Sequence, residues 1–370
     1  MATDDVYIKL IDHFREWIFG MPDGEELLPL LKWRITPVEA DLLSKMPFLT
    51  HTPEQLSERL KIPVEELIER LEVLSKKGLV FRVEGTDSNR YSMVDSSWPF
   101  RTWGWMGKDT EEAKKFAPLL NKYFENHYGA EYLGYPTIGL RAVPINETVE
   151  DPRQIMPYDN ILKIIDKARY FTKTACPCKY QRNQDAGHDN CKNDLHVCLH
   201  FDRVGEYVVQ NNIGTEITKE ETLEILKQSA DAGMVHGVSI SKEGVDTVCN
   251  CCKCCCVYVN GLLKMEGALR GHTPSNYIRE IDDEKCIGCG TCARACPMDA
   301  IEVVDKQVSF TPEKCIGCGV CVHKCPNEAL YLVHREGEQD YPENPRETAT
   351  RMLSERGHNP MESFKKNYWR

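Results

Sequence analysis

One cysteine pattern occurs twice near the end of the chain, and it constrains the fold more than any other feature. The pattern is C-x2-C-x2-C-x3-C-P, and its copies begin at Cys286 and Cys315, an offset of 29 residues. Gly288 and Gly317 lie between the first two cysteines of each copy. Thiolates spaced in this way can surround one cluster only if the chain turns tightly, which glycine permits. Each copy therefore predicts an iron–sulfur loop.

The repeated pattern resembles that of the bacterial-type two-cluster [4Fe–4S] ferredoxins. This resemblance implies that the fourth cysteine of each copy, redirected by the proline that follows it, binds the cluster of the other copy. The first cluster would be bound by Cys286, Cys289, Cys292 and Cys325. The second would be bound by Cys315, Cys318, Cys321 and Cys296. We place this module at residues 276–334, with short strands over 300–304 and 329–333. Zinc knuckles, the other interpretation, do not usually show eight interleaved cysteines.

The remaining ten cysteines all lie upstream of this module, and none precedes Cys176. The chain begins with acidic residues where a signal peptide carries basic ones, and it has no run of about 18 apolar residues. We therefore expect a cytoplasmic protein whose thiols bind metal rather than pair as disulfides. The formal net charge of −11 makes a general nucleic-acid binder an unfavourable interpretation.

The upstream cysteines form two groups. The early group is Cys176, Cys178, Cys191 and Cys198; the late group is Cys249, Cys251, Cys252, Cys254, Cys255 and Cys256. In a helix, Cys249, Cys252 and Cys256 would share a face. In an extended segment, Cys252, Cys254 and Cys256 would share one side, with Cys251 and Cys255 on the other. Either geometry points the thiols in at least two directions, so one cubane cannot use all six.

Three assignments of these ten cysteines remain open. The first is two further [4Fe–4S] clusters, each drawn from its own group or from both groups. The second is a single non-cubane or larger iron–sulfur assembly, and the consecutive cysteines are similar to the cysteine-rich domains of heterodisulfide-reductase-like proteins, although the Cys-Cys-Gly step of that family is absent. The third is zinc, with help from His188, His196 and His200. Because an iron–sulfur module lies beside them, we expect one or two additional iron–sulfur clusters.

The residues around these cysteines, 136–275, predict an α/β domain. Apolar patterning favours strands over 137–145 and 234–240 and helices over 158–170 and 218–232. His236 falls inside the second strand, where a packed or hydrogen-bonded histidine is more common than a proton donor.

The N-terminal residues 31–95 show helical patterns over 38–45, 52–60 and 63–77, followed by a predicted hairpin of strands at 79–84 and 90–94. This order resembles a winged helix-turn-helix domain. The third helix carries four acidic residues, Glu65, Glu66, Glu69 and Glu72, which repel phosphate. We therefore expect this domain to bind protein rather than DNA.

Two further segments complete the multidomain α+β organisation. Residues 96–135 form an aromatic-rich connector that we expect to pack between domains. Residues 335–370 are charged, and we expect an exposed tail with one short helix near 347–355.

The sequence contains no nucleotide-binding glycine loop, nucleophile elbow or carboxylate pair that would assign a catalytic residue. We therefore expect an iron–sulfur electron-transfer protein, a subunit or partner of an anaerobic oxidoreductase, with a redox protein as its partner. Two alternatives stay open. One is a redox-sensing winged-helix regulator, and the other is a catalytic protein whose middle cluster binds substrate.

Overall fold

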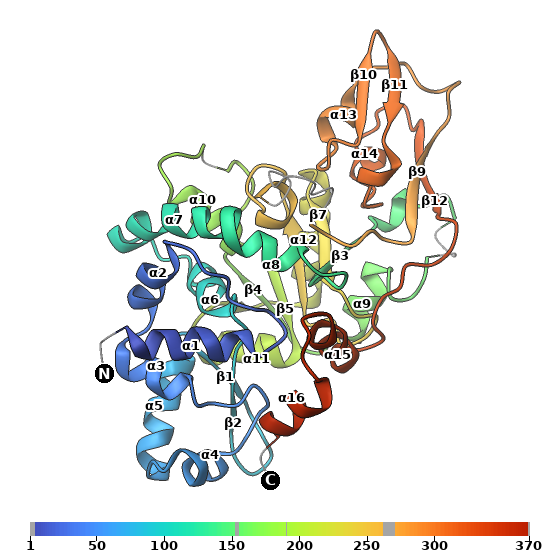
Figure 1. Ribbon diagram of the computed structural model, residues 1–370. Coiled ribbons are helices and arrows are strands. Elements are labelled where there is room, and N and C mark those ends of the chain that lie inside the picture. The colour runs from blue at the N-terminus through green and yellow to red at the C-terminus, as the bar shows by residue number, and fades with distance from the viewer. Residues whose placement is uncertain (1–3, 152–154, 190, 262–270, 369–370) are drawn as a thin grey trace.

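The computed structural model describes residues 4–151, 155–189, 191–261 and 271–368 (Figure 1). A helical N-terminal region and a small C-terminal module lie on either side of a central sheet. All 18 cysteines are free thiols.

The N-terminal region contains the predicted helices and hairpin. Its elements are α1 (Asp5–Arg15), α2 (Leu27–Arg34), α3 (Pro37–Leu43), α4 (Pro53–Leu60), α5 (Val64–Lys76), β1 (Val80–Val83) and β2 (Arg90–Met93). Helices α3 and α4 each begin with a capping box and a proline in the first turn, the start signal that the sequence carries. The two strands pair antiparallel. An isolated antiparallel β-bridge also joins His51 to Tyr91 of β2.

The aromatic connector is almost entirely helical. It consists of α6 (Trp98–Met106), α7 (Glu111–Tyr123), a π-helix (Phe124–Tyr128) and α8 (Gly129–Leu133). Its rings contact the regions on both sides: the ring centroid of Trp103 lies 4.9 Å from that of Trp33, and the ring centroid of Trp105 lies 4.4 Å from that of His200. The connector therefore packs between the domains, as expected.

The central sheet has six strands in the order β3-β7-β8-β5-β4-β6, and every pairing is antiparallel. The strands are β3 (Leu140–Val143), β4 (Phe171–Thr174), β5 (Cys198–Phe201), β6 (Thr215–Glu216), β7 (Val235–Ser239) and β8 (Thr247–Cys251). Its helices are α9 (Ile161–Lys167), α10 (Pro177–Asn183), α11 (Asp202–Gln210) and α12 (Lys219–Asp231). Strands β5 and β8 are neighbours, so an early cysteine and the late group meet at one end of the sheet.

The C-terminal module projects from the rest of the molecule in Figure 1. Its elements are β9 (Tyr277–Ile281), α13 (Thr291–Ala295), β10 (Ile301–Val304), β11 (Gln307–Phe310), α14 (Val320–His323) and β12 (Leu330–His334). The two predicted strands are β10 and β12; β10 pairs with β11, and β12 pairs with β9. The two cysteine loops therefore lie between two short antiparallel pairs.

The prediction of an exposed C-terminal tail is wrong, but the helix predicted near 347–355 is confirmed. The segment forms two helices, α15 (Pro345–Glu355) and α16 (Pro360–Asn367), that pack on the first half of the chain. The Nε atom of Arg356 lies 2.7 Å from Glu131, and the backbone N–H of Phe48 donates to Asn367 Oδ1 at 2.8 Å. Polar side chains that are typical of a solvated tail instead pair with partly or fully buried partners that are distant in sequence.

No helix in the described ranges combines the length and the apolar character needed to span a bilayer.

Candidate iron–sulfur and metal centres

The eight cysteines of the C-terminal module line two separate cavities. The cavity of about 360 Å³, including space open to solvent, is lined by Cys286, Cys289, Cys292 and Cys325, and we call it the outer cavity. The second cavity, the inner cavity, encloses about 350 Å³, including space open to solvent, and is lined by Cys315, Cys318, Cys321 and Cys296. This grouping is the one that the interleaved cluster assignment requires, including the exchange of the fourth cysteine between the two copies.

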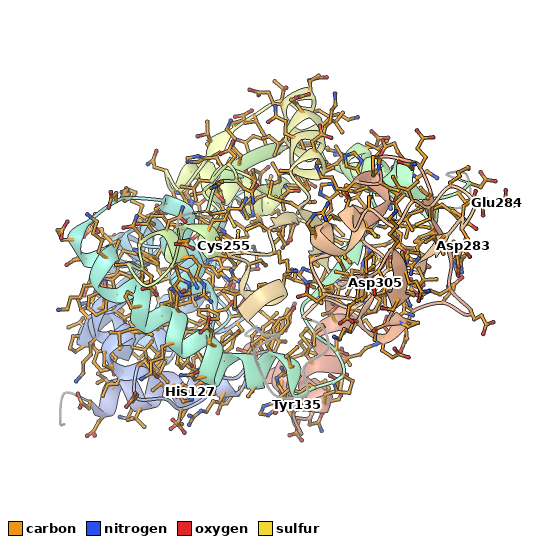
Figure 2. All side chains as sticks on the ribbon, turned by 90° about the horizontal axis from the view of Figure 1, so that it is seen from above. His127, Tyr135, Cys255, Asp283, Glu284 and Asp305 are labelled. Atoms are coloured by element: carbon orange, nitrogen blue, oxygen red, sulfur yellow. The ribbon has the colours of Figure 1, made fainter. Side chains whose placement is uncertain are left out.

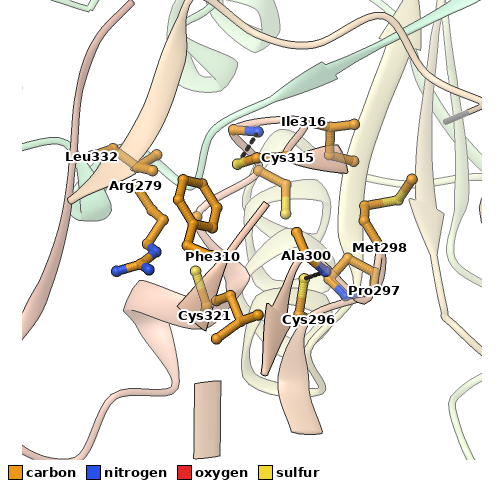
Figure 3. Close-up of a pocket in the computed structure, with 14 residues that line it drawn as sticks. Arg279, Cys296, Pro297, Met298, Ala300, Phe310, Cys315, Ile316, Cys321 and Leu332 are labelled. Carbon is orange, nitrogen blue, oxygen red and sulfur yellow. Dashed lines mark hydrogen bonds between the residues drawn. The ribbon is translucent and has the colours of Figure 1, made fainter. Parts of the chain in front are cut away.

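The inner cavity is closely wrapped by its loop (Figure 3). The backbone N–H groups of Gly317 and Ala300 donate to the sulfurs of Cys315 and Cys296 at 3.4 and 3.3 Å. Gly317 has a φ of +64°, and a Cβ atom there would lie 2.1 Å from the carbonyl oxygen of Tyr277. This glycine is therefore required for the loop to close over the cavity.

The two cavities differ in exposure. Cys318 and Cys321 of the inner cavity are buried, whereas Cys289 of the outer cavity is exposed. Burial raises the pKa of the Cys318 and Cys321 thiols, while hydrogen bonding to Thr291 lowers the pKa of Cys289. Buried thiolates need a cation beside them. A cationic iron–sulfur core bound by these thiolates meets that need, so the donor set fits a cluster.

The ten upstream cysteines divide into six and four. Side-chain interactions join six of them in a continuous series, in the order Cys198, Cys249, Cys251, Cys256, Cys178 and Cys176. The other four, Cys191, Cys252, Cys254 and Cys255, form a compact group of their own. Both sets draw on the early and the late groups, which is the mixed arrangement among the alternatives considered above.

Neither regular geometry assumed for the cysteine run is found. Strand β8 ends at Cys251, a turn covers residues 253–255, and a π-helix begins at Val257. Cys249 and Cys251 therefore share a strand face, and the turn directs the next thiols elsewhere. An extended run would place Cys256 on the same side as Cys252 and Cys254. Cys256 instead belongs to the six-membered set.

The six-membered set, together with Cys252 of the compact group, lines a large cavity, which we call the six-thiol cavity. It encloses about 1080 Å³, including space open to solvent. The Nη1 atom of Arg101 donates to Cys178 Sγ at 3.1 Å, and its guanidinium lies 4.6 Å from the ring centroid of Tyr258. Interactions with Cys176, Cys256 and Arg101 hold the pKa of Cys178 well below its usual range. The cavity thus combines thiolates with the fixed cation Arg101, and Lys179 also lines it.

Two residues that contact these thiols, Arg101 and His272, were missed by the sequence interpretation. Arg101 comes from the aromatic connector, more than 70 positions before the first cysteine. His272 Nε2 lies 3.8 Å from Cys251 Sγ, and burial lowers the pKa of this histidine to about 4. No local pattern links either residue to a metal centre, because their positions depend on tertiary packing.

The histidines named for a zinc site do not join the compact four-cysteine group. His188 contacts Arg182 at 2.6 Å, His200 lies between Thr174 and Thr247, and His196 is exposed. His236 is buried and contacts Asn250 Oδ1 at 2.7 Å, which agrees with the expected packing role.

Residues 278–326 match the family model described as a 4Fe-4S dicluster domain. The fold and the paired cavities, together with this match, define an iron–sulfur protein with a [4Fe–4S] dicluster domain. A 75-residue segment is 37% identical to a probable iron–sulfur subunit of the Frd operon of Proteus vulgaris, and covers 20% of this chain and 42% of that protein. The chain thus spans less than half of this relative's length. No solved structure matches the chain.

Proposed function

We propose that this chain is an iron–sulfur electron-transfer protein that works with a larger oxidoreductase in the cytoplasm. The observation that carries the proposal is the pair of cavities, each lined by four thiols from both cysteine loops. The relative from Proteus vulgaris is named as a probable iron–sulfur subunit, which supports a role within a multi-subunit enzyme.

The proposed ligands are the four cysteines that line each cavity. Bound clusters would supply one-electron chemistry, which needs no acid–base residue. The protein contributes backbone donors to sulfur, such as the N–H of Ala329 at 3.4 Å from Cys325, and different degrees of burial at the two cavities. These are the means by which a protein sets a reduction potential.

The exposure of the cavities supports a direction for electron transfer. The outer cavity lies at the surface, where Ile287, between two of its cysteines, is 57% exposed. The inner cavity is next to the cysteine run, because Lys253 of that run donates to the carbonyl oxygen of Cys296. We therefore propose that the redox partner binds at the outer cavity and that the inner cavity faces the middle domain.

For the middle domain, we propose one iron–sulfur assembly in the six-thiol cavity. Six thiolates exceed the four that a cubane needs, so a non-cubane or larger assembly suits this cavity. Arg101 provides a positive charge against the thiolates and lies 3.1 Å from Cys178. The resemblance to heterodisulfide-reductase-like domains is consistent with this assignment.

A catalytic role for the same cavity is a second candidate. Its open volume and its fixed cation would admit and orient a small anionic substrate. Carbon monoxide, added to the reduced protein, tests whether an iron in this cavity has an open position. A changed EPR spectrum favours the catalytic candidate, and an unchanged spectrum favours electron transfer alone.

For the N-terminal region, we propose a winged-helix-like domain that binds protein. The outward face of α5 presents Glu65 and Glu69 beside Val73, which is 54% exposed. Acidic and apolar residues on this face are unfavourable for contact with phosphates. The protein should leave the migration of mixed-sequence duplex DNA unchanged at physiological salt; retardation would favour the regulatory alternative.

Anaerobic analysis of iron and acid-labile sulfide tests the main proposal. Two cubanes contribute about eight irons and about eight sulfides per chain, and an assembly in the six-thiol cavity raises both numbers. Anaerobically prepared protein with fewer than about eight of each, after reconstitution with iron and sulfide, would contradict the proposal.

A further inference from the structure

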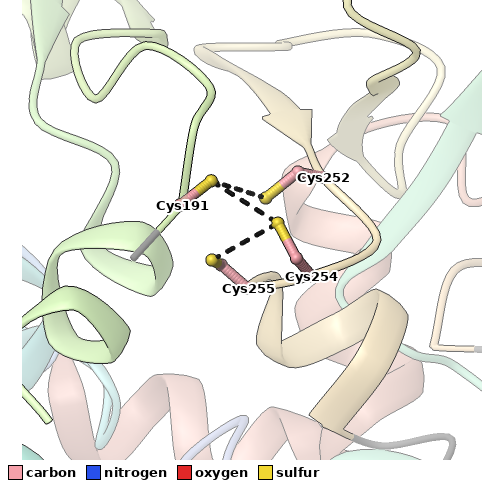
Figure 4. Close-up of side chains that lie close together, drawn as sticks. All are labelled: Cys191, Cys252, Cys254 and Cys255. Atoms are coloured by element: carbon pink, nitrogen blue, oxygen red, sulfur yellow. Dashed lines mark hydrogen bonds between the residues drawn. The ribbon is translucent and has the colours of Figure 1, made fainter. Parts of the chain in front are cut away.

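Four thiols in the middle domain are packed much more closely than a cluster needs. The sulfurs of Cys191, Cys252, Cys254 and Cys255 all lie within 4.8 Å of one another (Figure 4). The Sγ atom of Cys191 is 3.8 Å from that of Cys252 and 3.5 Å from that of Cys254. The Sγ atoms of Cys254 and Cys255 are also 3.5 Å apart.

These separations fit a single tetrahedral ion. Four sulfurs at about 2.3 Å from a central zinc ion lie about 3.8 Å from one another by tetrahedral geometry. In a cubane, each cysteine binds a different iron, so the four cysteine sulfurs lie farther apart. The same structure provides a comparison: in the part of the chain that it describes, the thiols of the two dicluster cavities do not form so compact a group.

Two elements hold the four-thiol group. Cys191 lies in the loop after α10, and its backbone N–H donates to Asn183 Oδ1 at 2.9 Å. Lys179 anchors the same loop by donating to the carbonyl oxygen of Asp194 at 2.8 Å. The other three cysteines come from the end of β8 and the turn after it. The group therefore bridges segments about 60 residues apart in sequence, as structural metal sites commonly do.

We propose that Cys191, Cys252, Cys254 and Cys255 bind one divalent ion, zinc, as a tetrathiolate site distinct from every iron–sulfur centre of the chain. Four protein ligands complete the tetrahedron and leave no position for substrate, so the site is structural. It ties the loop after α10 to the cysteine run and fixes the turn that carries Lys253. This inference does not depend on electron transfer by the dicluster module.

The test compares Cys191→Ser with Cys198→Ser in the full chain, purified anaerobically with zinc and iron present during expression. Cys198 belongs to the six-thiol cavity and serves as the matched control. We expect about one zinc per wild-type chain, bound by four sulfurs at about 2.3 Å in X-ray absorption. Cys191→Ser should lose this zinc and keep the wild-type iron and sulfide contents, whereas Cys198→Ser should keep the zinc.

Other outcomes separate the possibilities. Loss of iron together with labile sulfide in Cys191→Ser would overturn the inference, because those losses belong to a cluster. A disulfide between Cys254 and Cys255 in the metal-replete protein would overturn it as well. If Cys191→Ser lost a single iron and no sulfide, the one-ion site would be supported, and the bound ion would be iron instead of zinc. If Cys191→Ser does not fold, the absorption spectrum of the wild-type protein still decides between one ion and a cluster.

The inference and the proposed function fail separately. A dicluster module without iron would contradict the proposed function and would not affect the proposed tetrathiolate zinc site. A wild-type chain without a tetrathiolate zinc or iron ion would sink the inference and leave the dicluster cavities unaffected.

Discussion

Lys253 donates a hydrogen bond from its Nζ atom to the backbone carbonyl oxygen of Cys296, at a distance of 3.1 Å. The same amine lies 2.5 Å from Asp299. Lys253 is flanked by Cys252 and Cys254 of the four-thiol group, and Cys296 lines the inner cavity. One lysine therefore connects the cysteine run of the middle domain to the dicluster module.

Replacing Lys253 should lower the reduction potential of a cluster bound in the inner cavity. Lys253→Met removes a positive charge beside the inner cavity and leaves Asp299 unpaired, so adding an electron there becomes less favourable. We expect a fall on the order of tens of millivolts, given Coulomb's law at an effective dielectric constant of about 20 and screening by salt. An EPR-monitored redox titration measures it.

Lys219→Met is the matched control for this change. Lys219 is 41% exposed and pairs with Asp166 at 2.6 Å, close to the values for Lys253, but it lies at the far end of α12. This variant should keep the wild-type potentials. Equal shifts in both variants would show that the effect is not local to the inner cavity.

The exchange of cysteines between the two loops can be tested by pairing variants. Cys325→Ser should lose the same EPR signal as Cys289→Ser, because both side chains line the outer cavity. Cys296→Ser should instead match Cys318→Ser, which lines the inner cavity. Cys296 and Cys289 belong to the same cysteine loop. If Cys296→Ser lost the same EPR signal as Cys289→Ser, each loop would bind its own cluster and the interleaved assignment would be wrong.

Gly317→Ala should prevent the inner loop from closing. The added Cβ would lie 2.1 Å from the carbonyl oxygen of Tyr277, so we expect loss of about four irons per chain. Gly337→Ala is the control, since Gly337 also has a positive φ, +75°, but has no atom within 4 Å of a built Cβ. That variant should keep its iron and lose about 1 kcal/mol of unfolding free energy from backbone strain. Normal iron content in Gly317→Ala would refute the steric argument.

Arg101→Met should lower the potential of an iron–sulfur assembly in the six-thiol cavity, because it removes the cation that contacts Cys178. Arg101→Lys retains the charge and should recover part of the wild-type potential, while losing the planar contact with Tyr258. Spectroelectrochemical titration of both variants provides the comparison. Identical potentials in all three proteins would place the assembly away from Arg101.

The packing of the C-terminal helices predicts a difference between two arginines. The Arg356 side chain is 3% exposed and pairs with Glu131, so Arg356→Met should cost about 3 kcal/mol by leaving a largely buried carboxylate without this cation, although the Gly20 N–H still donates to it. Arg351, in the same region, is 27% exposed, and Arg351→Met should cost less than about 1 kcal/mol. Urea unfolding measures both. Similar small costs would mean that this segment contributes little to the folded state.

The dicluster module was predictable because its cysteines lie close in sequence and their spacing alone fixes the loops. Helices such as α4 and α12 were predictable for a similar reason, since Thr52 and Thr218 are capping residues that act over three positions. The partition of the upstream cysteines was not predictable. It depends on the point where β8 ends and on the pairing of β5 with β8, which join residues about 50 positions apart.

The contacts of the C-terminal segment were not predictable from local sequence either. Its charges are typical of a solvated surface, yet Glu355 accepts hydrogen bonds from the N–H and hydroxyl of Thr137, 218 positions away. Local composition does not indicate a hydrogen bond between residues so far apart in sequence. Figure 2 shows the described side chains as sticks on the ribbon, seen from above.

The unequal exposure of the two dicluster cavities has a practical consequence for handling the protein in air. We expect oxygen to reach the outer site first, because Cys289 is exposed whereas Cys318 and Cys321 of the inner site are buried. A partly oxidised sample would then contain molecules that have lost one cluster but retain Ile287 and the surface around it. If the proposed redox partner binds at the outer cavity, such molecules would still bind it and would pass no electrons, so they would inhibit the intact population rather than simply dilute it.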